Sequence, residues 1–578
     1  MPTAALRQIT AKQDNQALRA RLEAEAARVQ ISYKASVIDF MVMEGIQDFS
    51  ELDYATRKSF EAYLEGQSGM KHIRHHLLAF DKLKQHALSQ EFHILEDGKV
   101  ARPRYENGIL YLPYHPDPKV SAMFRNSTRK NEHVWDFSRN APERMKRQVF
   151  DILHYELENS TSPEGRRVHL LGLRDLYDFC TEQWIEDIEA MELPQIQAFR
   201  EIPSNRLTES KRPGIINFCR RALFLQAEEI NWNAHVWYME RFHIQPERMD
   251  PANPVLSISF VEVTHRRNRE LLKRYIRYGL GITNLSVGVI RGGGELIYLR
   301  SFLNDIQQPE DTDICSVTPA QMEAYFRVQR QRGVQAETYN KIVMSILHFF
   351  NHLRVRQLIG QIPFDADSLL QKTVLKHHNR SVAQEVTEEI FSKLYAFPET
   401  LRLMYLHLWG IGLRISEVCT LKGNAYYIQG DDAWIQVYQI KMRTYKRIPI
   451  PAALYKLMRV YLKKHHIKAG DYVFQNSKGG PYRSGTFRYN MLKYCERNDI
   501  QNGEYIFRSH DYRHTIATCF YDSGVSLQSI RDYLGHDYEE MTEQYIDYMP
   551  KKIEKASEDY FSRHSLASYI KRGEEKDG

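Results

Sequence analysis

Apolar residues recur every three to four positions along most of the chain, and this spacing predicts helices. Glycine and proline are few and grouped, so the breaks between the predicted helices are clear. The best strand signal is the alternating segment 433–440, which a short polar turn joins to 446–450. This pair predicts a β-hairpin, and 109–113 is a weaker strand candidate. The expected fold class is mainly α, with a small β-hairpin or sheet in the C-terminal domain.

Three stretches in the first two thirds of the chain share an order of apolar residues. Each begins with an apolar helix, continues through an acidic stretch into a second helix that ends in aromatic residues, and closes with a third apolar helix. The stretches cover about 30–95, 143–243 and 262–365. Any three-helix bundle gives this spacing, so the pattern predicts helical bundles and leaves true repetition open.

The length of the chain predicts several domains. Its 578 residues exceed the size at which a single core usually divides. The Pro-rich segment 246–254 and the polar segment 362–380 are the expected linkers. We therefore expect an N-terminal extension over 1–250, a helical module over 262–365, a C-terminal domain over 381–565 and a tail over 566–578.

Composition adds few constraints. The chain is 43% hydrophobic and 26% charged, as in ordinary globular proteins, and its net charge of +6 is mild. The six cysteines form no C-x-x-C pair, which favours reduced thiols in a cytosolic protein over a zinc site or a disulfide framework. No signal peptide and no membrane span are expected, because long apolar runs are missing.

Residues 381–550 carry the candidate chemistry in five short motifs. They are Gly412-Leu-Arg-Ile-Ser-Glu417, Lys441 eight positions before Pro449, Ser509-His-Asp-Tyr-Arg513, Leu534-Gly-His536 and Thr542-Glu-Gln-Tyr545. His510 and Arg513 are three residues apart, which places them on one face of a helix. His536 precedes Tyr545 by nine positions, which completes the pattern.

Together these motifs resemble those of the tyrosine recombinases, the family of phage integrases, Xer-like resolvases and Cre-like enzymes. The resemblance is motif-specific over 381–550, positional over 262–365, and does not extend to 1–250. It implies a catalytic domain preceded by helical-bundle DNA-binding modules, of which 262–365 would be the core-binding domain. The implied catalytic residues are Arg414, Lys441, His510, Arg513, His536 and Tyr545.

The chemistry explains these residue types. Two guanidinium groups, from Arg414 and Arg513, can offer paired donors to phosphate oxygens that gain charge. A tyrosine is weak at its usual pKa of about 10, so it needs a nearby base. The resemblance implies that Tyr545 attacks, His510 is the base, Lys441 protonates the leaving 5′-oxygen and His536 donates to the phosphate. Neither ATP, a metal nor another cofactor is implied.

Some assignments stay open at this point. Tyr548 lies one helical turn after Tyr545 and is the alternative nucleophile. Lys441 shares its turn with other cations, at 443, 446 and 447, and one of these could be the acid instead. Glu417 and Asp511 are expected to be structural, and His514 is expected to pack or cap.

Basic clusters before the catalytic motifs suggest duplex DNA as the partner, because phosphate contacts give affinity without sequence information. The candidate DNA-binding residues are Arg266, Arg267, Arg269, Lys273, Arg274, Arg277, Arg327, Arg330, Lys372 and Lys376.

The resemblance implies a site-specific recombinase, an integrase or transposase, that works as a tetramer on paired DNA in the bacterial cytosol. An accessory recombinase or host protein is a further possible partner. The alternatives are an Xer-like resolvase, a type IB topoisomerase-like enzyme, and an architectural DNA-binding protein without catalysis. The role of the first 250 residues stays open.

Overall fold

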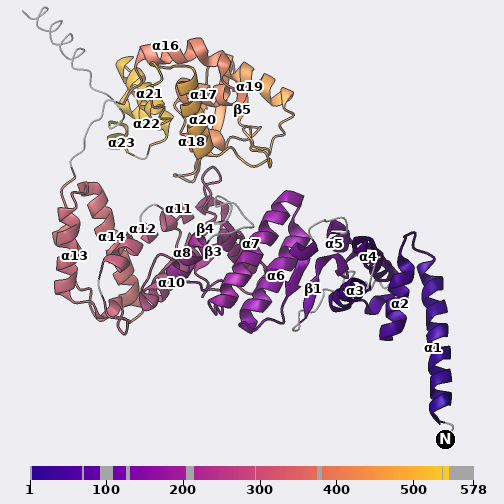
Figure 1. Ribbon diagram of the computed structural model, residues 1–578. Helices are drawn as coiled ribbons and strands as arrows, with labels where there is room; N and C mark the ends of the chain where they lie inside the picture. Colours follow the sequence, from indigo (N-terminus) through magenta and orange to yellow (C-terminus); the bar gives the residue numbers. More distant parts are fainter. Residues whose placement is uncertain are drawn as a thin grey trace, which may run out of the picture. The chain divides into compact units, whose positions relative to one another are not determined.

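The computed structural model describes residues 3–67, 71–90, 108–124, 130–202, 214–292, 295–306, 308–373, 380–536, 538–543 and 545. The chain forms two compact units, Met1–Arg241 and Phe242–Gly578. Helices dominate both units, and the strands are short (Figure 1). The expected fold class is therefore confirmed. None of the described helices is both long enough and apolar enough to cross a membrane.

The first part of unit 1 is a helical bundle with its own core. Its elements are α1 (Thr3–Ala26), α2 (Lys34–Glu44), the 3-10 helix η1 (Phe49–Glu51), α3 (Tyr54–Gly66) and α4 (Ile73–Gln90). The rings of Phe40, Phe60 and Phe80 are buried at its centre, with centroids 5.1 and 5.4 Å apart. These apolar residues lie on helix faces that the 3.6-residue period brings together.

The second part of unit 1 adds a strand pair to a bundle. Its elements are β1 (Ile109–Tyr111), η2 (Leu112–Tyr114), α5 (Pro118–Phe124), η3 (Lys130–His133), β2 (Val134–Asp136), α6 (Glu143–Asn159), α7 (Pro163–Glu182), α8 (Leu193–Glu201), α9 (Gly214–Gln226), β3 (Val236–Tyr238) and η4 (Met239–Arg241). β1 and β2 are antiparallel, with Leu110 opposite Trp135. The predicted strand at 109–113 is confirmed as far as Tyr111, after which the chain turns into η2.

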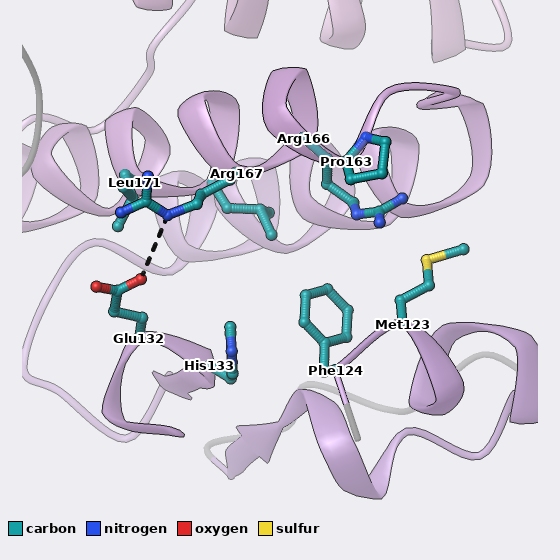
Figure 2. A pocket seen from close by; sticks show the side chains of 9 residues that line it. Met123, Phe124, Glu132, His133, Pro163, Arg166, Arg167 and Leu171 are labelled. Carbon is teal, nitrogen blue, oxygen red and sulfur yellow. Dashed lines mark ion pairs between the residues drawn. The ribbon is translucent and has the colours of Figure 1, made fainter. Parts of the chain in front are cut away.

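A pocket lies between α5 and α7 in this part of the unit (Figure 2). Met123 and Phe124 line it from α5, and Arg166 and Leu170 line it from α7. The Cζ atom of Arg166 lies 5.9 Å from the centre of the Phe124 ring, so a cation–π contact spans the two walls.

Unit 2 begins with a helical module. Its elements are η5 (Pro246–Arg248), β4 (Ser257–Ser259), α10 (Arg266–Gly281), α11 (Val287–Arg291), α12 (Glu295–Asp305), η6 (Ile314–Ser316), α13 (Pro319–Gln331), α14 (Ala336–Val355) and α15 (Ala366–Leu369). The segment 246–254 was expected to be a linker. Instead, Arg248 is buried and donates to the carbonyls of Gly279, Leu280 and Leu285 at 2.7 to 2.9 Å, which fixes the segment to the end of α10.

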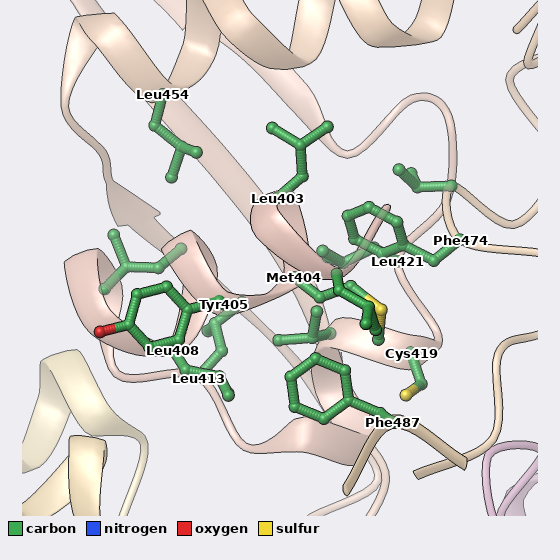
Figure 3. Packing of buried hydrophobic residues seen from close by; sticks show 14 of the residues in the cluster. Leu403, Met404, Tyr405, Leu408, Leu413, Cys419, Leu421, Leu454, Phe474 and Phe487 are labelled. Atoms are coloured by element: carbon green, nitrogen blue, oxygen red, sulfur yellow. The ribbon is translucent and has the colours of Figure 1, made fainter. Parts of the chain in front are cut away.

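The C-terminal domain surrounds one hydrophobic core. Its elements are α16 (Gln384–Lys393), η7 (Leu394–Ala396), α17 (Glu399–Ile411), α18 (Ile415–Cys419), β5 (Tyr426–Gln429), β6 (Asp432–Gln439), β7 (Thr444–Pro449), α19 (Ala452–Lys464), α20 (Ser484–Arg497), α21 (Asp511–Asp522), α22 (Leu527–Leu534) and α23 (Glu539–Glu543). Leu408, Met404 and Phe487 pack at its centre (Figure 3). The strands form an antiparallel sheet of order β5-β6-β7, which confirms the predicted hairpin.

Candidate active site

Arg414 is the N-cap residue of α18 and follows a turn that favours glycine at position 412. Helix α17 ends at Gly412, whose φ of 62° is a left-handed conformation that suits glycine. A Cβ atom there would also lie 3.3 Å from Ile516. The backbone N–H of Arg414 donates to Glu417 Oε2, and its Nη1 donates to Glu417 Oε1, both at 2.9 Å. Glu417 therefore fixes both the backbone and the guanidinium group of Arg414.

Arg513 projects from α21 into the interior of the domain and is fully buried. Its Nη1 donates to the carbonyl of Gly412 at 2.9 Å, and its Nη2 donates to the carbonyl of Leu534 at 2.6 Å. Its Nε has no hydrogen-bond partner among the described residues. Burial and the nearby Arg414 lower the pKa of Arg513 to about 10, so the group remains a cation at neutral pH. The two arginines thus bring two positive charges together.

His536 is buried beside Arg513. Its Nε2 lies 2.9 Å from Nη2 of Arg513, and its Nδ1 lies 3.0 Å from the hydroxyl of Thr542. A guanidinium group can only donate, so Nε2 is the acceptor and Nδ1 carries the proton. Burial and the charge of Arg513 lower the pKa of His536 to about 2, which agrees with a neutral ring. In this arrangement His536 cannot donate to a phosphate through Nε2.

Tyr545 and His510 meet directly. The Tyr545 hydroxyl lies 2.9 Å from Nε2 of His510, which precedes the first residue of α21. Burial of the His510 ring, followed by the nearby His514 and Arg513, lowers its pKa to about 4. His510 is therefore neutral at pH 7 and can accept the phenol proton. Both residues come from one chain, so this pair needs no second protomer.

The ring of Tyr545 is held among aromatic and cationic groups. The ring of His514 stacks on it at 4.4 Å, the ring of His536 lies 4.7 Å away, and Arg513 Cζ is 5.7 Å from its centre. The hydroxyl of Thr518 donates to the Tyr545 carbonyl at 3.3 Å. The contact with Tyr545 agrees with the packing role expected for His514. By this contact His514 orients the phenol of Tyr545.

The two lysines of the β6–β7 hairpin lie in different environments. Lys441 is exposed in the turn, between β6 and β7. Lys446 is buried, with its Nζ 3.6 Å from Glu417 Oε2 and 3.3 Å from the carbonyl of Leu534. Burial lowers the pKa of Lys446 to about 8, although Glu417 opposes this change. The lysine inside the polar network is therefore Lys446, whereas the predicted Lys441 stands outside it.

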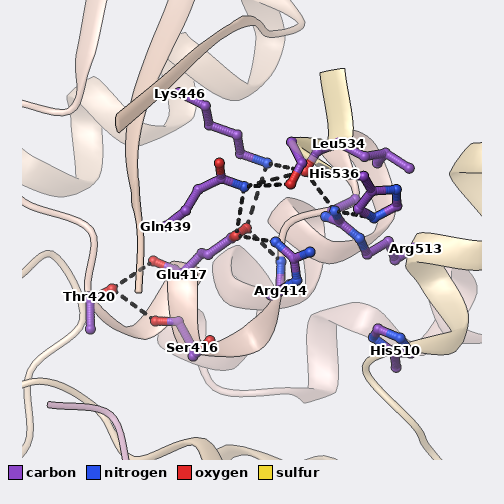
Figure 4. A network of polar contacts seen from close by, with 12 residues as sticks. Arg414, Ser416, Glu417, Thr420, Gln439, Lys446, His510, Arg513, Leu534 and His536 are labelled. Atoms are coloured by element: carbon purple, nitrogen blue, oxygen red, sulfur yellow. Dashed lines mark hydrogen bonds and ion pairs between the residues drawn. The ribbon is translucent and has the colours of Figure 1, made fainter. Parts of the chain in front are cut away.

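A second layer of polar groups supports the arginines (Figure 4). Lys446, Arg513 and the amide of Gln439 all donate to the carbonyl of Leu534. Gly535 has a φ of 70°, and a Cβ atom there would lie 2.2 Å from Gln439 Nε2. The glycine of the Leu-Gly-His motif is therefore required by the close approach of Gln439. The motifs gave no role to Gln439 or Thr542, and they offered Lys446 only as an alternative to Lys441.

Glu417 is the one carboxylate that the structure places inside this network, among the residues it describes there. Burial raises its pKa, but Lys446, Arg513 and Arg414 together hold the pKa below its usual value. A single negative charge thus faces three cations. The excess positive charge suits an anionic ligand such as a phosphodiester. The expected structural role of Glu417 agrees with these contacts.

The predicted DNA-binding residues divide into three groups. The exposed ones are Arg266, Arg267, Arg274, Arg277, Arg327, Arg330 and Lys372. Arg269 and Lys273 are buried, because they lie on the α10 face that also carries Leu272 and Ile276. These two side chains are not available for phosphate contacts in this conformation, which corrects the expectation for them. Lys376 and the alternative nucleophile Tyr548 lie outside the described residues.

Residues 381–552 match the phage integrase family. Transposase B from transposon Tn554 of Staphylococcus aureus is 25% identical over 332 residues, which are 54% of this chain and 51% of that protein. Tyrosine recombinase XerA of Thermococcus onnurineus is 26% identical over 234 residues, 40% of this chain and 77% of the relative. The chain thus spans about half the length of the Tn554 transposase that it matches.

Two solved structures have distant similarity to the chain. The Tn1549 transposon integrase in complex with transposon right end DNA has a TM-score of 0.38 and 16% identity, covering 51% of this chain and 98% of that one. The XerH site-specific recombinase bound to difH substrate has a TM-score of 0.37 and 15% identity, covering 50% and 83%.

The matched region, 381–552, contains the two arginines, the histidines and Tyr545. Residues 381–552 are therefore a domain of the phage integrase family, and the sequence resembles a transposase and the Xer tyrosine recombinases. The resemblance that the five motifs indicated is confirmed at the level of this family.

Proposed function

We propose that this protein is a site-specific DNA recombinase, an integrase or transposase, that cleaves and rejoins DNA through Tyr545. The observation that carries the proposal is the 2.9 Å contact between the Tyr545 hydroxyl and Nε2 of a neutral His510, beside two guanidinium groups. A phenol, a base that can take its proton and cations that can bind a phosphate are the parts that this reaction needs.

The reaction has a simple balance of bonds and protons. The Tyr545 oxygen attacks the phosphorus while its proton moves to Nε2 of His510. The bond from phosphorus to the 5′-oxygen breaks, and a general acid protonates that oxygen. The products are a 3′-phosphotyrosyl link and a free 5′-hydroxyl. Arg414 and Arg513 stabilise the charge that develops on the non-bridging oxygens. A 5′-hydroxyl from another strand reverses the steps.

We assign the acid to Lys441 and a positioning role to Lys446. Lys446 already contacts Glu417 and the Leu534 carbonyl from a buried position, so moving it to the leaving oxygen would leave a buried carboxylate less compensated. Lys441 is exposed in the hairpin turn and is open to a DNA strand. Its place eight residues before Pro449 also matches the family's hairpin lysine.

The proposed partners follow from the reaction. Strand exchange needs two DNA sites, so we propose a tetramer on paired duplexes, with an accessory recombinase or host protein as a further possible partner. The exposed arginines of α10 and α13 are proposed phosphate contacts of a core-binding module. We place the protein in the bacterial cytosol, where such DNA is accessible.

Covalent trapping tests the proposal. Nicked duplexes from the DNA that flanks the coding gene are incubated with the full chain, and complexes that survive SDS are isolated. The wild type is expected to form a protein–DNA adduct, and Tyr545→Phe is expected to form none. An adduct that persists in Tyr545→Phe contradicts the choice of nucleophile. No adduct on any duplex favours an architectural DNA-binding protein.

A second assay separates the two lysines. A substrate with sulfur at the 5′-bridging position has a better leaving group, which departs without a general acid. Cleavage by Lys441→Ala is expected to recover on this substrate. Cleavage by Lys446→Ala is expected to stay slow on both substrates, because loss of Lys446 would displace Arg414 and Arg513. If cleavage by Lys446→Ala alone recovered on this substrate, Lys446 would be the general acid and Lys441 the positioning residue.

Plasmid topology separates recombination from a topoisomerase-like activity. A recombinase is expected to join two sites and leave plasmids without a site supercoiled. Relaxation of a plasmid that carries no site would favour the type IB topoisomerase-like alternative, because that reaction needs one duplex only.

A further inference from the structure

A nine-residue pattern occurs three times before the catalytic domain. The segments are 48–56 (DFSELDYAT), 187–195 (DIEAMELPQ) and 313–321 (DICSVTPAQ). Each starts with aspartate, has apolar residues at its second and fifth positions, and ends with threonine or glutamine. The second-position residues, Phe49, Ile188 and Ile314, are all fully buried. The segments lead into α3, α8 and α13, and each of these helices is followed by a long apolar helix, α4, α9 or α14.

The hydrogen bonds of the three segments are the same. The aspartate carboxylate accepts from the backbone N–H two residues later, at 2.7, 2.9 and 2.9 Å. The backbone N–H of the sixth residue donates to the side chain of the ninth, at 2.7, 2.8 and 2.9 Å. Generic bundles share helical spacing but not two identical caps at fixed offsets. The shared caps at fixed offsets support repetition of the three modules, which helical spacing alone left open.

The second and third modules also begin alike. Strand β2 leads through Phe137 to Lys146, and strand β4 leads through Phe260 to Arg269; in each pair the second residue follows the first by nine positions. Both cations are buried near the start of α6 or α10. Lys146 donates to the Phe137 carbonyl, and Arg269 donates to the Val263 carbonyl, each at 3.1 Å.

The first helices of these two modules differ in charge. Helix α10 carries six lysine or arginine residues and one glutamate, whereas α6 carries three lysine or arginine residues and four acidic ones. His154 takes the place of the exposed Arg277 and is buried, 3.4 Å from His115. Helix α6 of the second module therefore lacks the exposed basic face that α10 carries in the third.

Positive charge recurs at another place, which we name the basic turn. It comprises the last two turns of α3, α8 or α13 and the segment up to the first turn of the following helix. It carries the exposed cations Lys71 and Arg74 in the first module, Arg200 at the end of α8 and Arg327 in the second half of α13. None of these four has an ion-pair or hydrogen-bond partner within the part of the chain that the structure describes. Other arginines of the second module face carboxylates, as Arg221 faces Glu240 at 2.6 Å.

We propose that the front unit contributes two further copies of the core-binding module, and that each copy contacts the backbone of duplex DNA through its basic turn. The inference rests on the proposed function for the role of the third module. Exposed cations that have no partner among the described residues fit phosphates, which release counterions on binding. The front copies would extend the contact with DNA beyond the cleavage site without reading its sequence.

Salt dependence of binding by the full chain tests this inference. A duplex of about 60 base pairs without a recombination site is titrated at several salt concentrations. The variant Lys71→Gln/Arg74→Gln/Arg200→Gln is expected to reduce the slope of log affinity against log salt by about two to three, at roughly 0.9 per lost contact. Lys58→Gln and Arg221→Gln remove cations of the same modules that are paired with glutamates, and are expected to leave the slope unchanged.

The outcomes are separable from those of the proposed function. A slope equal to that of the wild type overturns the inference, and a changed state of association in sedimentation would then assign the basic turns to protein contacts. Covalent trapping on a short nicked duplex should be unaffected by the triple variant. If trapping fails for the wild type while the slopes still change, the proposed function fails and the front modules still bind DNA.

Discussion

Two buried arginines, one in each unit, show what distinguishes support from chemistry in this chain. Arg57 in the first bundle contacts Asp81 through Nε at 2.8 Å and Nη2 at 3.4 Å, and Tyr114 donates to the same carboxylate. Arg513 contacts two backbone carbonyls and a neutral histidine instead. The charge of Arg57 is neutralised by its direct partner, whereas the direct partners of Arg513 are all uncharged.

The difference explains why burial alone does not mark a functional site. A buried ion pair is compensated within the protein, so its loss costs stability. Neutral acceptors hold a guanidinium group in place but leave its positive charge for a ligand. Replacement of Arg57 should therefore lower the stability of the first unit, and replacement of Arg513 should slow cleavage by the second.

The largest effect on stability is expected for Arg57→Ala. This change leaves Asp81 buried without its cation, which should lower the free energy of unfolding of the first bundle by about 3–5 kcal/mol. Urea denaturation followed by fluorescence measures it. DNA cleavage per folded molecule should stay unchanged, and a loss of cleavage would show that the front unit takes part in the reaction.

Arg513→Gln is expected to reduce the cleavage rate by about 10²–10³-fold, because a preorganised donor to the phosphate is lost. Single-turnover cleavage of the nicked duplex measures the rate, and circular dichroism checks that the domain still folds. An equal loss for Arg513→Gln and for Arg57→Ala would remove the distinction between the two arginines.

Gly535→Ala should disturb the site through packing. The left-handed φ of 70° costs roughly 1–2 kcal/mol with a Cβ atom, and that atom would displace Gln439. We expect a lower melting temperature and slower cleavage. The double variant Gly535→Ala/Gln439→Ala should recover part of both, and the absence of any recovery would mean that Gln439 is not what requires the glycine.

Thr542→Val is expected to slow cleavage by about fivefold, which corresponds to roughly 1 kcal/mol for one lost hydrogen bond. The hydroxyl of Thr542 accepts from Nδ1 of His536 and so fixes the tautomer whose Nε2 faces Arg513. Thr542→Ser should retain the rate. Equal rates for the valine and serine variants would contradict this tautomer.

The smallest expected effect is on the pH dependence of cleavage. A histidine with an ordinary pKa of about 6.5 would become protonated as the pH falls through that value and would stop accepting the phenol proton. His510 has its pKa lowered to about 4, so it stays neutral until the pH falls near 4. The cleavage rate should therefore show no acid limb between pH 5 and 7. A limb near pH 6.5 would contradict this environment for His510.

The motifs predicted which side chains lie together in this domain, because helix and turn geometry reproduces sequence spacing. His510 and Arg513 are three residues apart on α21, and the turn after α17 needs the glycine before Arg414. The burial of Lys446 within the polar network was harder to predict. Residues of β7 alternate between buried and exposed, so Lys446 shares the inward face with Ile448, a signal present in the sequence. The turn residue Lys441 has no such constraint.

Helical spacing also contained the signal that separates the buried cations of α10 from the exposed ones. Arg269 and Lys273 are three positions before and one position after Leu272, on the face that packs inward. Other features could not be predicted from local pattern. The contacts of the Leu534 carbonyl with Gln439 and Lys446 join segments about 90 residues apart, and only the folded domain brings them together.

The most direct test of the account is the identity of the residue that carries the DNA. A covalent complex from the wild-type chain is digested with nuclease and protease, and the peptide that retains a nucleotide is sequenced by mass spectrometry. We predict a phosphotyrosyl link at Tyr545, formed only when His510 is intact. A link at Tyr548 or at any other residue would contradict the site that the 2.9 Å contact between Tyr545 and His510 defines.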